Sequence, residues 1–181
     1  MYKISKEFRD IQGSVCISGS KSESNRLLLL RAYTSFFKIY NLSDSDDTQL
    51  MISAIKSDKK NINIGHAGTA MRFLTSYFSS ISEKSKVLTG SERMRQRPIS
   101  ILIDALRDLG CDIEYLEKKG FPPLKIKGKN ILSNSVSLPA NVSSQYVSSL
   151  MMLGVSLKNG LKIILSSNIT SLPYLLMTKK I

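Results

Sequence analysis

Residues 18–26, SGSKSESNR, place hydroxyl and basic side chains directly before a run of leucines. The leucines predict a helix over residues 22–37, so the polar residues fall at its N-terminus. Unpaired N–H groups and a partial positive charge suit a helix N-terminus to an anion. Ser22 and Arg26 share one helix face, directly after Lys21, so the three side chains could converge on one phosphate. A capped helix with solvated basic residues explains the same stretch, and taken alone the stretch favours it because caps are common.

We call such a strand-to-helix junction a corner, and residues 18–26 form the first. A second corner follows a strand predicted over residues 61–65. Its sequence is GHAGTAMR, in which Gly68 and Arg72 are four residues apart and Thr69 lies between them. A glycine lets an anion approach the backbone, and an arginine one turn later can neutralise its charge. A tight turn and a surface arginine are the alternative interpretation.

A third corner, NVSSQ, opens a helix predicted over residues 142–154. Ser143, Ser144 and Gln145 supply neutral hydrogen-bonding groups that suit hydroxyls or phosphate oxygens, although helix capping explains them as well. Each corner is a weak signal by itself. Their recurrence at equivalent strand-to-helix positions favours an anionic ligand over a purely structural role.

An arginine cluster stands at the expected start of the helix over residues 97–110. The stretch SERMRQRP contains Arg93, Arg95 and Arg97. The helix dipole disfavours cations at this end of a helix. The cluster therefore indicates a nearby anion or acidic surface, unless the three side chains simply stay solvated.

The elements that carry these corners repeat along the chain. Strands are predicted over residues 14–20, 39–43, 61–65, 86–90, 111–117, 123–129, 135–140 and 161–167, and helices over 22–37, 46–57, 66–78, 97–110, 142–154 and 170–181. The order is β-α-β-α, then β-α-β-α-β-β, then β-α-β-α, an internal repeat longer than that of a solenoid. The third unit stops inside its second helix, so we expect a chain truncated in its third unit.

The composition is that of a globular protein with excess positive charge. The 181 residues are 42% hydrophobic, with 26 basic and 14 acidic side chains and a net charge of +12. This excess favours an anionic partner: nucleic acid, acidic lipid, or a phosphorylated or carboxylated small molecule. Cys16, Cys111 and the single histidine, His66, predict free thiols, no metal site and no histidine-based triad. The lack of a long apolar run or signal sequence predicts a soluble, cytoplasmic protein.

Six blocks of the sequence, in order, closely resemble the 5-enolpyruvylshikimate-3-phosphate synthase (3-phosphoshikimate 1-carboxyvinyltransferase) family. They are GSKSESNRLLLLRA, NLSDSDDT, GHAGTAMRFLT, LTGSERMRQRPI, SSQYVSSLMM and SLPYLLMT. The resemblance covers essentially the whole chain, and GSKS-NR together with AGTAMR is highly specific. The related UDP-N-acetylglucosamine enolpyruvyl transferases share the fold but fit these blocks poorly.

The resemblance implies an α/β (α+β) fold of two similar domains, each built from three βαβαββ units and closing over the substrates. Residues 14–181 would form an incomplete shikimate-phosphate-binding domain, and residues 1–13 would belong to the other domain. The C-terminal catalytic domain would be absent. In the family that domain carries the acidic residue at the target hydroxyl, a Lys-Glu pair and further basic residues, so the resemblance implies no complete active site here.

The reaction implied by the resemblance transfers the enolpyruvyl group of phosphoenolpyruvate to the 5-hydroxyl of shikimate 3-phosphate and releases phosphate. It belongs to the shikimate pathway of aromatic amino acid biosynthesis, and the family is the target of glyphosate. The mechanism is addition and elimination through a tetrahedral ketal, with no cofactor and no metal. Both substrates are multiply anionic, which agrees with the basic composition.

The resemblance also implies roles for individual residues. Lys21, Arg93 and Gln145 would act in catalysis. The substrates would contact Lys21, Ser22, Arg26, Gly68, Thr69, Arg72, Arg93, Ser143, Ser144, Gln145, Ser171 and Tyr174. Lys21 and Gln145 would reach both ligands, and Gly68 and Arg93 would lie at the phosphoenolpyruvate site.

The sequence departs from the family at His66, where the family usually has Asn. An imidazole can still donate one hydrogen bond, but its size and charge differ from those of an amide. For the full-length enzyme we expect a monomer, with no nucleic acid and no membrane as partners, whereas surfaces exposed by truncation predict association of this chain. Two other interpretations stay open: a basic nucleic-acid-binding module, and a non-catalytic remnant that keeps the pocket.

Overall fold

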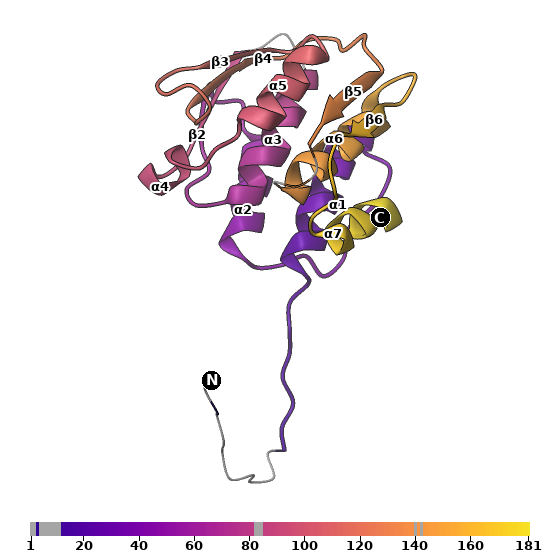
Figure 1. The fold of residues 1–181 in the computed structure, drawn as a ribbon. Helices are drawn as coiled ribbons and strands as arrows, with labels where there is room; N and C mark the ends of the chain where they lie inside the picture. Colours follow the sequence, from indigo (N-terminus) through magenta and orange to yellow (C-terminus); the bar gives the residue numbers. More distant parts are fainter. Residues whose placement is uncertain (1–2, 4–11, 82–84, 140, 142) are drawn as a thin grey trace.

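Three helices that begin at the Ser- and Gly-rich corners form the centre of the fold in the computed structural model (Figure 1). The structure describes residues 3, 12–81, 85–139, 141 and 143–181. The helices are α1 (Lys21–Thr34), α2 (Asp46–Lys56), α3 (Gly68–Ser80), α4 (Glu92–Arg95), α5 (Ser100–Asp108), α6 (Ser144–Ser156) and α7 (Leu172–Lys180). Among the described residues no helix is both long and apolar enough to span a bilayer.

Two sheets flank the helices. β1 (Asn61–Asn63), β2 (Ser85–Thr89), β4 (Leu124–Lys127) and β3 (Asp112–Tyr115) are neighbours in this order, and only β1 and β2 are parallel. β5 (Ser135–Leu138) and β6 (Lys162–Leu165) form a second, parallel pair. Parallel strands need a crossover connection, and α3 and α6 supply it for the two parallel pairs. The order β-α-β-α therefore occurs twice, which confirms the predicted repeat for these two units.

The central helices pack through small polar residues as well as apolar ones. Ser149 of α6 donates its hydroxyl to Ser76 of α3 over 2.6 Å, and both side chains are fully buried. Within α3, the hydroxyls of Thr75 and Ser79 donate to carbonyls one turn earlier. Small side chains bring the helix axes close together, and the bonds satisfy their buried hydroxyls. Phe73 and Leu74 fill the remaining space on α3 and are fully buried.

Most predicted elements are confirmed, but the strands predicted over residues 14–20 and 39–43 are wrong. Both segments are described, and neither is paired in a sheet. The prediction that the arginine cluster stands at the start of the helix over residues 97–110 is also wrong. Glu92–Arg95 forms a separate short helix, and α5 begins only at Ser100. Residues 1–13, which the resemblance assigns to the other domain, lie mostly outside the described residues, so that part of the domain prediction stays a prediction.

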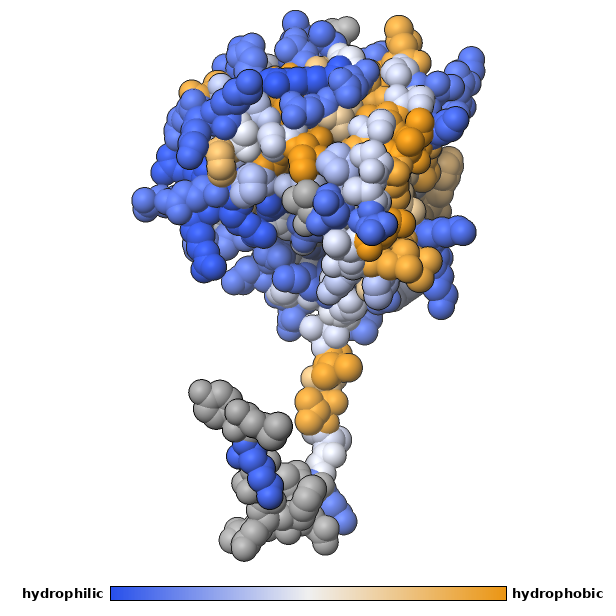
Figure 2. All heavy atoms as spheres, in the orientation of Figure 1, coloured by the Kyte–Doolittle hydropathy of each residue, from blue (hydrophilic) through white to orange (hydrophobic). Residues whose placement is uncertain are grey.

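The surface divides into a polar and a more apolar side. Figure 2 shows hydrophilic residues gathered over the side that carries α4, and hydrophobic residues on the side that carries β6 and α7. The exposed apolar side chains on the second side include Ile164, Leu172 and Leu176. Both cysteines are free, as predicted: Cys16 is exposed and Cys111 is buried.

Candidate anion-binding site

The starts of α1, α3 and α6 lie at one end of the helix bundle. Arg26 of α1 places its guanidinium carbon 5.5 Å from the ring centre of Phe73 in α3 and donates to Ser148 of α6 over 3.2 Å. Each of these three residues lies four or five positions beyond the first residue of its helix. Farther along, Tyr33 of α1 lies beside Tyr77 of α3, and Ser149 of α6 bonds to Ser76 of α3. The three helices therefore run parallel, and their unpaired N–H groups and positive dipole ends face the same region.

Direct side-chain contact joins the starts of α3 and α6. The amide nitrogen of Gln145 donates to the hydroxyl of Thr69 over 3.1 Å. Ser143 caps α6 by accepting the backbone N–H of Gln145, and Ser144 is almost fully buried. The second and third predicted corners are thus brought together, although they lie more than seventy residues apart in the sequence.

At the first corner, Ser20 is the cap and Lys21 is held by an acidic residue. The hydroxyl of Ser20 accepts the N–H of Glu23 over 3.4 Å. The ammonium of Lys21 lies 3.1 Å from a carboxylate oxygen of Asp47, and half of the lysine side chain is exposed. Capping and a basic side chain near the helix start therefore coexist at this corner.

Arg26 points into the protein and is only 2% exposed. Its Nε donates to the hydroxyl of Thr178 over 2.6 Å, and Nη2 donates to Ser148 and to the carbonyl of Tyr174. Nη1 donates to the carbonyl of Ser22. Burial lowers the pKa of Arg26, and the nearby Tyr174 partly opposes this shift. These bonds tie α1 to α6 and α7, so the structure gives Arg26 a structural role beside its predicted phosphate contact, which stays a prediction.

Arg72 is also turned inward, with 5% of its surface exposed. Its Nη1 donates to the carbonyl of Gly68, and its Nη2 to the carbonyl of Pro98, which also accepts the hydroxyl of Tyr146. No described carboxylate pairs with Arg72. Burial lowers its pKa, Tyr146 opposes the shift, and the like charge of Arg97 adds to it. A buried guanidinium without an acidic partner leaves net positive potential at the start of α3.

A pocket of about 380 Å³ lies at the same corner and is lined by His66, Arg93, Met94 and Arg97. We call it the basic pocket. The guanidinium of Arg97 occupies the space that a side chain at Gly68 would fill. Within the described part of the chain, neither Arg93 nor Arg97 forms an ion pair with a carboxylate. The resemblance predicts Arg93 as a site residue, whereas the sequence indicates Arg97 only as a member of the arginine cluster.

The third arginine of that cluster behaves differently. Arg95 is neutralised by Glu117 at 3.3 Å, and both side chains are substantially exposed. The regular spacing of Arg93, Arg95 and Arg97 does not show which of them is paired with a carboxylate. The short helix α4 ends at Arg95 and the chain then turns, so Arg97 does not continue the helix. Only the fold shows which two arginines share a pocket.

Ser171 and Tyr174 stand at the start of α7. Ser171 precedes the helix with a positive φ of 56°, and its side chain makes no capping bond. The ring centre of Tyr174 lies 5.8 Å from the guanidinium carbon of Arg26, and the side chain is part-exposed. Tyr174 therefore approaches the first corner through Arg26, whereas Ser171 is linked to it only by its carbonyl, which accepts the N–H of Tyr174.

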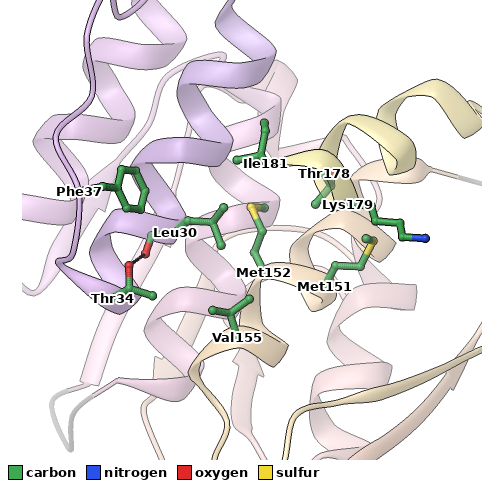
Figure 3. Close-up of a pocket in the computed structure, with 9 residues that line it drawn as sticks. All are labelled: Leu30, Thr34, Phe37, Met151, Met152, Val155, Thr178, Lys179 and Ile181. Carbon is green, nitrogen blue, oxygen red and sulfur yellow. Dashed lines mark hydrogen bonds between the residues drawn. The ribbon is translucent and has the colours of Figure 1, made fainter.

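A different hollow, of about 370 Å³, lies between α1, α6 and α7 (Figure 3). Its lining is mostly apolar and includes Leu30, Phe37, Met152 and Val155, whereas Lys179 is its one charged side chain. Such a lining does not suit a multiply charged anion. The basic pocket is the better candidate for anion binding.

Comparison with known proteins agrees with the geometry. The family model for EPSP synthase (3-phosphoshikimate 1-carboxyvinyltransferase) matches residues 55–181. A 3-phosphoshikimate 1-carboxyvinyltransferase of Bacteroides fragilis is 48% identical over 169 residues, which cover 93% of this chain and 41% of the relative. One of Colwellia psychrerythraea is 38% identical over 195 residues, covering 93% and 46%.

Solved structures show the same fold at lower sequence similarity. An EPSP synthase from Acinetobacter baumannii has a TM-score of 0.73 and 20% identity, and it matches 93% of this chain and 43% of its own. The chain spans about two fifths of the length of the curated relatives it matches. The family match over residues 55–181 and the identity of 48% to a family member show that this chain belongs to the EPSP synthase family.

Proposed function

We propose that this chain forms the shikimate 3-phosphate-binding half of a 3-phosphoshikimate 1-carboxyvinyltransferase, and that it binds substrate without turning it over by itself. The reaction would transfer the enolpyruvyl group of phosphoenolpyruvate to the 5-hydroxyl of shikimate 3-phosphate. The family of the chain supports this reaction, and its coverage of about two fifths of its relatives motivates the restriction to binding.

One observation carries the proposal: basic groups without acidic partners gather at the start of α3, which lies beside the start of α6. Arg72, Arg93 and Arg97 form no ion pair with any described carboxylate. Uncompensated positive charge is unfavourable where side chains are partly desolvated, and a bound anion would offset it. Anionic groups such as phosphate are also the ligands favoured by helix N-termini.

The proposed chemistry is an addition followed by an elimination. The 5-hydroxyl gives up its proton and its oxygen bonds to C2 of phosphoenolpyruvate, while a proton adds to C3, which gives a tetrahedral ketal. Loss of a proton from C3 and cleavage of the bond between C2 and the phosphate oxygen then yield the enolpyruvyl ether and inorganic phosphate. Arg93 and Lys21 would neutralise phosphoenolpyruvate, Ser143 and Ser144 would hold the shikimate phosphate, and Gln145 would reach both ligands.

Calorimetric titration of the chain with shikimate 3-phosphate tests the proposal, with shikimate as the ligand control. We expect saturable binding that requires the phosphate. Lys21→Gln should weaken it about tenfold or more, because a charge-assisted hydrogen bond contributes roughly 1.5–3 kcal/mol. Lys158→Gln is the matched control, since it makes the same charge change on an exposed residue beyond α6.

Three results would contradict the proposal. A folded chain that fails to bind shikimate 3-phosphate would contradict the part of the proposal that assigns substrate binding to this chain. Binding that weakens equally in both lysine variants and falls steeply with added salt would indicate non-specific attraction of anions, of the kind expected for a basic nucleic-acid-binding surface. Release of phosphate by the chain alone would contradict the restriction to binding.

A further inference from the structure

His66 stands at the edge of the basic pocket and is tied to the loop before α4. Its Nδ1 lies 2.8 Å from the hydroxyl oxygen of Ser91, twenty-five residues away in the sequence. His66 also lines the basic pocket together with Arg93 and Arg97. One ring nitrogen is thus occupied by a protein partner, which leaves Nε2 as the nitrogen available to a ligand.

The direction of the hydrogen bond between Ser91 and Nδ1 fixes which ring nitrogen of His66 carries the proton. The hydroxyl oxygen of Ser91 accepts the backbone N–H of Met94 over 3.3 Å, which caps α4. The single hydroxyl proton of Ser91 has no acceptor among the described residues other than Nδ1 of His66. A serine hydroxyl has one proton and two lone pairs, so Ser91 can cap α4 and donate to Nδ1 at the same time. When Ser91 donates in this way, neutral His66 carries its proton on Nε2 and presents a hydrogen-bond donor.

The charges on the two sides of His66 differ. The basic pocket holds the guanidinium groups of Arg93 and Arg97, neither of which pairs with a described carboxylate. On its other side His66 borders a hollow of about 450 Å³ that is lined by Asp46 and Asp47. An anion is attracted to the first side and repelled from the second, so the basic pocket is where a donor on His66 would be used.

We propose that His66 donates a hydrogen bond from Nε2 to an oxygen of a small carboxylated or phosphorylated anion in the basic pocket, and that Ser91 is the residue that positions its ring. The inference rests on the proposed function only where it takes phosphoenolpyruvate to be that anion. Arg93 and Arg97 supply the charge, and His66 adds a directional donor that a guanidinium pair alone does not provide.

Nitrogen NMR of the imidazole tests this directly, because the chain has one histidine and its ring signals are unambiguous. The long-range proton–nitrogen spectrum of the free chain should show the tautomer protonated at Nε2. Titration with phosphoenolpyruvate, with and without shikimate 3-phosphate, should shift the Nε2 signal with saturation. Inorganic phosphate is the second probe, and chloride at equal ionic strength is the control. Protonation at Nδ1 would overturn the inference. Ring signals that shift with neither phosphoenolpyruvate nor inorganic phosphate would overturn it as well.

Variants give an independent readout. His66→Leu removes the donor and should weaken phosphoenolpyruvate binding roughly tenfold, whereas His66→Gln retains an N–H donor and should recover part of the loss. Ser91→Thr keeps the hydroxyl and should keep the tautomer. Ser91→Ala should mix the two tautomers, with circular dichroism used to verify that the fold persists. Unchanged affinity in His66→Leu, or an unchanged tautomer in Ser91→Ala, would refute the respective part of the proposal.

The two proposals fail in different ways. If shikimate 3-phosphate does not bind but phosphoenolpyruvate shifts the His66 signals, the proposed function fails and this inference stands. If shikimate 3-phosphate binds and phosphoenolpyruvate does not shift the His66 signals, the proposed function stands and this inference fails. His66→Leu should leave the affinity for shikimate 3-phosphate unchanged, since His66 lies at the basic pocket rather than among the serines of α6.

Discussion

The guanidinium of Arg97 lies against Gly68, in the space that any side chain at position 68 would occupy. Gly68 is the first residue of α3, and its own carbonyl accepts a hydrogen bond from Arg72. The glycine therefore makes room for a basic side chain of the same pocket, in addition to any room it makes for a ligand. This relationship joins two parts of the chain that are separated by the whole of α3 and β2.

Gly68→Ala should displace Arg97 without unfolding the protein. The added methyl group meets the far end of a flexible side chain, so the arginine can move aside at little cost. Alanine also restricts the unfolded chain more than glycine does, which favours the folded state by about 0.4–1 kcal/mol where the backbone permits it. We expect the affinity for phosphoenolpyruvate to fall about tenfold while the melting temperature stays equal or rises, as measured by calorimetric titration and scanning calorimetry.

Arg97→Ala is the matched comparison for this experiment. If Gly68 acts through Arg97, the two substitutions together should cost little more than either one alone. Additive losses would show that Gly68 affects the ligand by a separate route.

Asp47→Asn should raise the affinity for shikimate 3-phosphate. Lys21 lies 3.1 Å from Asp47, and it must leave that partner in order to reach a phosphate. A partly exposed ion pair contributes about 0–1 kcal/mol, so its removal should tighten binding by up to about fivefold. Asp46→Asn removes a neighbouring charge that forms no ion pair with a described residue, and titrations of both variants should differ. Equal affinities in wild type and in both variants would contradict the expected competition.

Arg26→Ala should destabilise the fold rather than only weaken ligand binding. The variant leaves Thr178, Ser148 and the carbonyl of Tyr174 without their charged donor at the junction of three helices. Loss of buried hydrogen bonds to a charged group should lower the free energy of unfolding by about 2–4 kcal/mol. Urea unfolding measures this change. Arg31→Ala, at an exposed position in the last turn of the same helix, should cost less than about 1 kcal/mol.

Stability should fall in alkaline solution partly because of Cys111. Burial raises the pKa of its thiol from 9.0 to about 11, a shift that Ser79 and Lys129 partly oppose. The folded state then favours the protonated thiol, so this contribution is complete below pH 9.0 and is lost as the pH rises toward about 11. Unfolding midpoints across this window should decline less steeply in Cys111→Ala. The exposed Cys16 should react with a thiol reagent in the native protein, whereas Cys111 should react only after unfolding.

The apolar side of the molecule should promote association at high concentration. Ile164 and Leu176 are 46% and 54% exposed on β6 and α7. Charged substitutions at both positions should shift sedimentation toward the monomer, while Val15→Lys in the extended segment before α1 should have less effect. A monomer at all concentrations in wild type would show that this surface is tolerated in solution.

Helix positions were the most predictable part of the fold, because their signals are local. Ser20 and Ser143 cap the helices that begin directly after them, and apolar spacing indicated α2 and α6 to within a few residues. The strands predicted over residues 14–20 and 39–43 failed because a strand needs a partner, and neither segment pairs with a described strand. A suitable composition does not supply that partner.

The family, the repeated α/β unit and the residues at the three helix starts follow from the amino-acid sequence alone. How those residues are used depends on how the helices pack together. Helical spacing places Arg26 and Arg72 on a helix face, but it does not say whether that face is turned inward, as both are here. The Gln145–Thr69 bond and the Ser91–His66 contact join residues that are distant in the chain. Such contacts depend on how distant segments of the chain pack against each other, and a one-dimensional pattern does not carry that information.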